Sequence, residues 1–125
     1  MNKLEYIMFF NGDIVYIHGS VRVISSCDGY YATYYDENES LQEVNVNVIE
    51  GIPITPEILK KNGWKKFKRP YSSDYCYRRK GYTTLNIRSD KEVYFHWGDH
   101  DKSITTVHQL QHLLFGLGLN SEMEV

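Results

Sequence analysis

Residues 51–64, which read GIPITPEILKKNGW, predict a short helix in the middle of the chain. Thr55 is a favourable N-cap, and Pro56 suits the first helical position because its missing N–H is not needed there. The Asn62-Gly63 pair then ends the helix. The residues on either side of this segment differ in pattern and charge. The sequence therefore predicts two parts, residues 1–51 and residues 52–125.

The first part has the pattern of short strands joined by tight turns. The pairs Asn11-Gly12, His18-Gly19 and Asp28-Gly29 separate apolar runs, and an acidic loop at 36–40 precedes a predicted strand at 41–48. Strands separated by turn signals at this spacing indicate a small barrel. We expect an SH3-like β-barrel over residues 1–51, with a plain antiparallel meander as the alternative.

The second part, residues 52–125, is predicted to be an α+β lobe with a helix, antiparallel strands and a C-terminal helix. Strands are expected at 64–68, 75–79, 82–89 and 92–97, residues 98–102 read as a polar turn, and the last residues alternate like a short edge strand. Thr106 and Gln109 fit a capping box at the start of a helix over 106–115. Its apolar stripe is expected to pack on Leu85, Ile87, Val93 and Phe95, and consists of Val107, Leu110, Leu113, Leu114 and Leu117.

Charge is distributed unevenly along the chain. The formal net charge is −2, but residues 58–91 hold eleven basic and two acidic residues, whereas residues 1–57 hold two basic and nine acidic ones. Such asymmetry informs the choice of partner more than the fold. The sequence has no apolar run near the about 18–20 residues of a membrane span and no export signal, so we expect no membrane association.

The basic middle region is the strongest functional signal, because its cations are interleaved with aromatic residues. Cations neutralise phosphate, and aromatic rings stack on bases. We therefore predict binding of nucleic acid or a phosphorylated nucleotide, without catalysis or cofactor. The predicted ligand-binding residues are Lys65, Lys66, Lys68, Arg69, Tyr75, Tyr77, Arg78, Arg79, Lys80 and Tyr82. In the alternative interpretation, these cations clamp internally against the acidic half of this chain or of a second copy.

Two other functions stay open at this point. A protein–protein interaction module is suggested by the tyrosines at positions 30, 31, 34 and 35, since tyrosine is enriched at interfaces. A metal-dependent enzyme would need several of His96, Asp99, His100, Asp101, His108 and His112 to converge. Cys27 and Cys76 are expected to be reduced thiols rather than a disulfide.

Two segments of the chain carry a family resemblance. IPITPEIL at 52–59 followed by Asn62-Gly63-Trp64, and VHQLQHL at 107–113, resemble the signatures IPLTPEIL…NGF and YVHQLQ(H/N)L. These signatures are typical of small uncharacterised proteins of Bacteroidetes phages, prophages and mobile elements. The resemblance implies an accessory role in the host bacterial cytoplasm, for example inhibition or modulation of a host system through a host protein. It implies no activity and no catalytic residues.

Overall fold

The computed structural model describes residues 9–68, 75–79, 83–88, 92–97 and 99–125. The chain divides into two compact units, Met1–Ile52 and Pro53–Val125, and each is described here by itself. Each unit contains one five-stranded antiparallel sheet, and the described residues of the second unit add the helices α1 and α2. The predicted α+β class is therefore confirmed.

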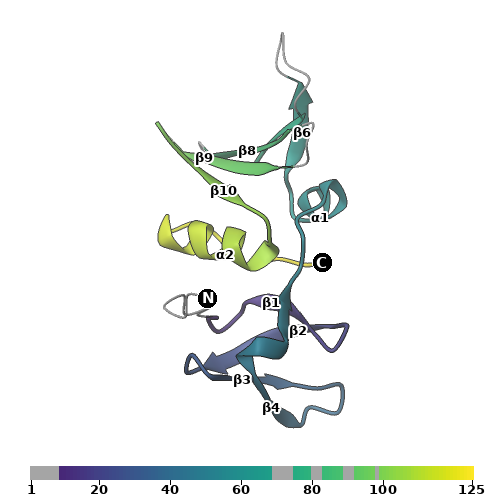
Figure 1. The fold of residues 1–125 in the computed structure, drawn as a ribbon. Helices are drawn as coiled ribbons and strands as arrows, with labels where there is room; N and C mark the ends of the chain where they lie inside the picture. The colour runs from purple at the N-terminus through teal and green to yellow at the C-terminus, as the bar shows by residue number, and fades with distance from the viewer. Residues whose placement is uncertain (1–8, 69–74, 80–82, 89–91, 98) are drawn as a thin grey trace. The chain divides into compact units, whose positions relative to one another are not determined.

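The N-terminal unit is a sheet with the strand order β4-β3-β2-β1-β5. Its strands are β1 (Ile14–Ile17), β2 (Ser20–Cys27), β3 (Tyr31–Tyr35), β4 (Leu41–Asn45) and β5 (Ile49–Gly51) (Figure 1). His18 and Gly19 both have positive φ and join β1 to β2 as a two-residue turn, because Ile17 pairs directly with Ser20. Alternate residues of these strands, with Phe9 from the segment before β1, build a core of Phe9, Val15, Ile17, Ile24, Ala32 and Tyr34.

The SH3-like barrel is not confirmed, because the sheet does not close. Among the described residues, β4 and β5 are the two edges of the sheet and do not pair with each other. The predicted strand over 41–48 is also shorter than expected. A 3₁₀ turn, η1 (Val46–Val48), follows β4, and Asn45 caps this turn by accepting from the Asn47 N–H at 2.9 Å.

The junction helix α1 (Pro56–Lys61) forms as predicted, because local signals define both of its ends. The Thr55 side chain accepts from the Ile58 N–H at 3.2 Å, and Pro56 occupies the first turn. Gly63, at φ +86°, follows the C-cap, and the Trp64 N–H returns to the Leu59 carbonyl at 2.9 Å. This Schellman closure turns the chain directly into the first strand of the second sheet.

The C-terminal sheet has the order β10-β9-β8-β7-β6. Its strands are β6 (Lys65–Lys68), β7 (Tyr75–Arg78), β8 (Thr83–Ile87), β9 (Val93–Trp97) and β10 (His100–Ile104). The prediction of a polar turn at 98–102 is wrong, since His100, Asp101 and Lys102 belong to β10. An exposed edge strand carries polar residues and therefore lacks the apolar alternation that would reveal it.

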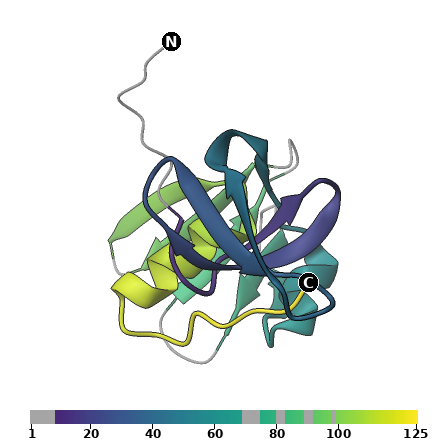
Figure 2. The ribbon, with the colours of Figure 1, turned by 90° about the horizontal axis from the view of Figure 1, so that it is seen from below.

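Helix α2 (Val107–Gly116) lies across one face of this sheet (Figures 1 and 2). Gln109 supplies its half of the predicted capping box by accepting from the Thr106 N–H at 3.2 Å. Within the predicted stripe, Val107, Leu110 and Leu114 are fully buried, Leu113 is half-buried and Leu117 is exposed. The buried stripe is therefore narrower than predicted, and it ends at Leu114, two residues before the end of the helix.

The carboxyl-terminal segment forms no strand and is instead held by side chains. The Asn62 amide donates to the Glu124 carbonyl and accepts from the Glu124 N–H, both at 2.7 Å, which imitates one step of a β-ladder. Gln111 donates to the Ser121 carbonyl at 3.2 Å, and Met123 is buried. These contacts anchor residues 120–125, which we call the C-terminal tail, to the core of the second unit.

Candidate ligand-binding face of the C-terminal sheet

Strand register assigns the side chains of the second sheet to two faces, because directly opposed residues of antiparallel strands point to the same side. Tyr77, Leu85 and Phe95 lie in one cross-strand row and are buried. We call their side the inner face. The opposite side, the outer face, carries two rows, Lys65–Arg78–Thr84–His96–Asp101 and Phe67–Cys76–Asn86–Tyr94–Ser103.

Two arginines of the outer face lie over aromatic rings. The Arg78 guanidinium carbon is 4.9 Å from the centroid of the Phe67 ring, and that of Arg88 is 4.0 Å from the centroid of the Tyr94 ring. Such pairing orients the planar guanidinium and leaves its N–H edge available. Both arginines are exposed, whereas Phe67 and Tyr94 are half-buried. The outer face thus presents two exposed guanidinium groups, each of which lies over an aromatic ring.

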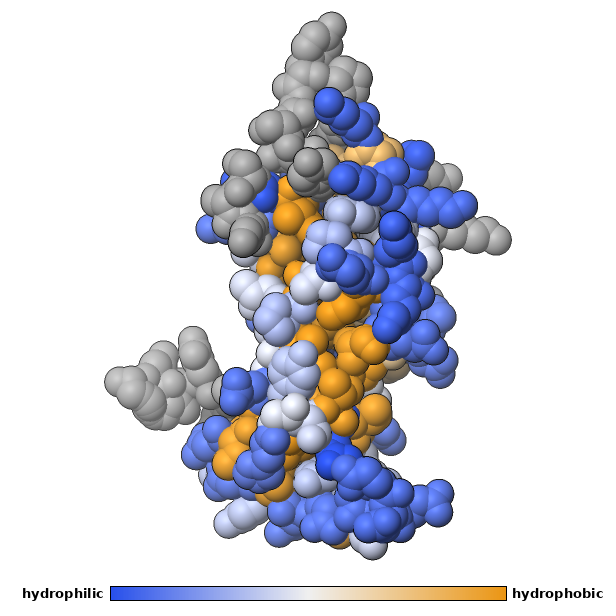
Figure 3. All heavy atoms as spheres, turned by 90° about the vertical axis from the view of Figure 1, so that its right-hand side faces the viewer, coloured by the Kyte–Doolittle hydropathy of each residue, from blue (hydrophilic) through white to orange (hydrophobic). Residues whose placement is uncertain are grey.

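The described cations of the outer face have few acidic neighbours. Among the described residues, neither Lys65, Arg78 nor Arg88 forms an ion pair with a carboxylate. The acidic neighbours lie toward β9 and β10, where Asp101 is exposed and Glu92 accepts from the Tyr94 hydroxyl at 2.7 Å. In the C-terminal unit, at the top of Figure 3, hydrophilic side chains gather on the side of α1 and β6, where exposed lysines lie.

Arg79 and Tyr77 belong to the other side of the same strand. Tyr77 is only 4% exposed and packs in the core. The Arg79 guanidinium lies over the buried ring of Trp64, 5.1 Å from its centroid, and donates to the Asn120 carbonyl at 2.8 Å. Burial lowers the pKa of Arg79 from its ordinary value. This arginine therefore anchors the C-terminal tail, and we leave both residues out of the candidate site.

The other predicted ligand residues are only partly brought together. Lys65 lies on the outer face opposite Arg78, whereas Lys66 and Lys68 project to the other side of the edge strand β6. The Tyr75 backbone pairs with Lys68, but its side chain lies outside the described residues. The predictions for Arg69, Lys80 and Tyr82 also fall outside them.

Sequence reasoning missed Phe67, Arg88 and Tyr94 as members of one site. Arg88 follows the alternation of Thr84 and Asn86, and Tyr94 alternates with Val93 and Phe95, so the period of two already separates these residues from the core. The sequence does not provide the register between β6 and β9. Without that register, three residues from three strands cannot be assigned to one surface.

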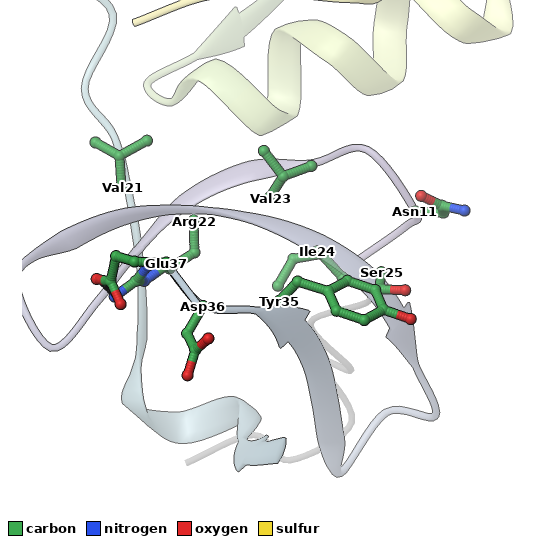
Figure 4. Close-up of a pocket in the computed structure, with 9 residues that line it drawn as sticks. All are labelled: Asn11, Val21, Arg22, Val23, Ile24, Ser25, Tyr35, Asp36 and Glu37. Atoms are coloured by element: carbon green, nitrogen blue, oxygen red, sulfur yellow. Dashed lines mark hydrogen bonds and ion pairs between the residues drawn. The ribbon is translucent and has the colours of Figure 1, made fainter. Parts of the chain in front are cut away.

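The N-terminal unit contains a hollow of about 410 Å³ between β2 and the end of β3 (Figure 4). Val21 and Val23 point to one side of β2, and Arg22 points to the other, where its guanidinium bonds Glu37 at 2.6 Å. That hydrogen bond raises the pKa of Arg22 and lowers the pKa of Glu37. Asp36 accepts from the backbone N–H groups of Asn38 and Ser40, both at 2.9 Å. The charged groups of this hollow therefore serve the local structure.

Of the tyrosines considered as an interface, Tyr34 is a core residue and Tyr30, Tyr31 and Tyr35 are 65%, 49% and 58% exposed. Tyr31 and Tyr35 share a face of β3, and Tyr35 pairs with the exposed Leu41 of β4. The N-terminal unit therefore presents aromatic and apolar side chains on its surface.

The histidines and cysteines do not assemble into a cluster in the part of the chain that the structure describes. No group of three or more His, Cys, Asp or Glu side chains there is arranged to hold a metal ion. The rings of His108 and His112 lie 5.8 Å apart between centroids, edge to face. Cys27 and Cys76 form no disulfide.

Neither of the described helices has the length and apolar character needed to cross a lipid bilayer.

Comparison with known proteins adds no relative to this description. Protein-family models, curated proteins and solved structures were each searched, and none of the three comparisons gave a match.

Proposed function

We propose that this protein is a binding protein without catalytic activity, and that the outer face of its C-terminal sheet takes a ligand containing both phosphates and bases, a nucleotide or a nucleic acid. The observation that carries the proposal is the pair of arginines on aromatic rings, Arg78 on Phe67 and Arg88 on Tyr94, beside Lys65 on one face. Phosphate is an acceptor for the guanidinium edge, and a base can stack on its plane.

The absence of ion pairs in the described part of this face supports the same conclusion. An exposed cation without a carboxylate partner adds little to the free energy of folding, but it can contribute strongly to binding of a polyanion. The N-terminal unit handles charge differently, since Arg22 already has Glu37 as its partner. The outer face is therefore the better candidate for an anionic ligand.

The biological setting is part of the proposal and rests on the resemblance of residues 52–64 and 107–113 to proteins of phages and mobile elements. In that setting the protein is an accessory factor in the cytoplasm of a bacterial host, where it modulates a host system by sequestering a nucleotide-containing ligand. We also keep the SH3-like assignment of the N-terminal unit as a proposal. It is supported by the strand order, with β5 beside β1, and by the 3₁₀ turn between β4 and β5.

The test is equilibrium binding of a labelled oligonucleotide and of ATP, measured as fluorescence anisotropy and competition over a series of salt concentrations. The proposal expects binding that weakens steeply with salt, because released counterions drive the association. Lys65→Glu should weaken it further, and Glu57→Gln, on the exposed surface of α1, is a control that should not reduce it. No binding of either ligand at low salt would refute the proposal.

A second candidate function is favoured by the exposed side chains of Tyr30, Tyr31 and Tyr35. Here the N-terminal unit contacts a protein partner, either a host protein or a second copy of this chain. Tyr35→Ser should abolish capture of one discrete partner, or dissociate a dimer in sedimentation experiments. Unchanged capture and unchanged mass would remove this candidate.

A further inference from the structure

We propose that the ligand of the outer face is a single strand of nucleic acid that spans both arginine–aromatic pairs, rather than a mononucleotide held at one of them. This inference rests on the proposed function and specifies the class of ligand. It follows from the spacing of the two pairs, from the presence of two of them on one face and from the chemistry of arginine.

The spacing follows from the register of four consecutive strands. Phe67 pairs with Cys76, Cys76 with Asn86, and Asn86 with Tyr94, so the two rings lie three strands apart in one row. At the usual strand separation the rings are about 14 Å apart. A stacked strand advances roughly 3.4 Å per nucleotide, so about four or five nucleotides cover this distance. A mononucleotide reaches one pair, and a short strand reaches both.

The two pairs are related by a local two-fold axis through the centre of the β7–β8 hairpin. Cys76 and Asn86 oppose each other at this centre, where the Cys76 thiol lies 3.8 Å from the Asn86 side-chain oxygen. Arg78 follows Cys76 by two residues, and Arg88 follows Asn86 by two residues. One such pair would suffice for a mononucleotide. Two pairs on one surface provide two contacts, and a ligand that uses both must extend across the hairpin.

The chemistry of the pairs favours unpaired bases over a duplex. In a duplex, the base faces are stacked on each other, so that only the phosphates, the sugars and the base edges in the grooves are accessible from outside. The Arg78 and Arg88 guanidinium groups lie over the Phe67 and Tyr94 rings, and a guanidinium plane is a surface on which an unstacked base can stack. A site that binds phosphates alone uses the N–H edge of the guanidinium and does not need its plane.

The experiment uses the full chain and fluorescein-labelled oligothymidylates, from the dinucleotide to a strand of about a dozen nucleotides. Affinity should rise with length, level off near the length that spans both pairs, and exceed that for a duplex of the same length. Arg88→Lys should reduce affinity for the long strand by about 5- to 150-fold, the contribution of one stacked base, with the salt dependence retained. Arg78→Lys should do the same, and with either variant the gain from added length should disappear.

The outcomes separate this inference from the proposed function. If thymidine monophosphate or ATP binds as tightly as the long strand, the proposed function stands and the inference is wrong. If duplex binds more tightly than the single strand, or if both lysine variants bind like the wild type, the inference is also wrong. If no probe binds, both are wrong.

The variant Phe67→Leu tests the aromatic support of Arg78, because leucine retains apolar volume but removes the ring. Its affinity for the long strand should equal that of Arg78→Lys, and circular dichroism checks that the Phe67→Leu protein is folded.

Discussion

The neighbours Arg78 and Arg79 show how differently the two faces of one sheet use the same side chain. Arg79 lies over the buried Trp64 ring and donates to the C-terminal tail, whereas Arg78 lies over the half-buried Phe67 on the outer face and has no carboxylate partner among the described residues. The inner arginine has both a ring and a hydrogen-bond acceptor within the unit. In the part of the chain that the structure describes, the outer arginine has a ring but no carboxylate, and this difference makes the outer face a candidate for a ligand.

The largest effect is expected at the inner face. Leu110 is fully buried on α2, so Leu110→Ala should reduce the free energy of unfolding by about 2–5 kcal/mol, the range for a buried large-to-small change. A urea melt measures this loss. A loss near zero would mean that α2 does not cover the core side of the sheet, and the distinction between the faces would fail.

The next effect concerns the anchor of the C-terminal tail. Arg79→Ala removes the bond to the Asn120 carbonyl and the contact with Trp64, and should reduce the free energy of unfolding by about 1–3 kcal/mol. Asn62→Ala, which removes both bonds to Glu124, should have an effect of similar size. Limited proteolysis should detect release of residues 120–125 in both variants. An intact tail would show that these bonds do not anchor it.

At the outer face the expected effect on stability is small. Arg78→Ala and Arg88→Ala should each reduce the free energy of unfolding by about 0.5–1 kcal/mol, the range for a cation–π contact at an exposed site. Their effect should appear in oligonucleotide binding. If either variant were to unfold, its arginine would be an internal clamp, as in the alternative interpretation of the basic segment.

The smallest effect is expected in the N-terminal unit, where carboxylates accept hydrogen bonds from the backbone of two turns. Backbone N–H groups donate to Asp28 and Asp36 and lower the pKa of both carboxyls. A lowered pKa in the folded state adds stability that is fully present above the unfolded pKa and is lost as pH falls through the folded pKa. Acid titration should therefore loosen the turns after β2 and β3 slightly, and Asp36→Asn should flatten that slope. An unchanged slope would contradict the assignment.

Local signals in the sequence were sufficient for the helices and for most strands. Thr55, Pro56 and Gly63 define α1 with bonds that join residues a few positions apart, so sequence rules capture it. Strand β10 was missed because its exposed residues have no apolar alternation. The site was only partly predicted. A run of basic residues reveals composition, but consecutive residues of a strand point to opposite faces, and only the register separates Arg78 from Arg79.

The central claim is that the outer face binds the ligand and that the inner face stabilises the fold. Thermal unfolding and binding of a long oligothymidylate should therefore be measured together for Arg78→Ala and Arg79→Ala. The account predicts that Arg78→Ala retains the melting temperature and loses about tenfold or more in affinity, whereas Arg79→Ala lowers the melting temperature and retains affinity in the folded state. Equal losses of affinity, or a reversed pattern, would contradict it.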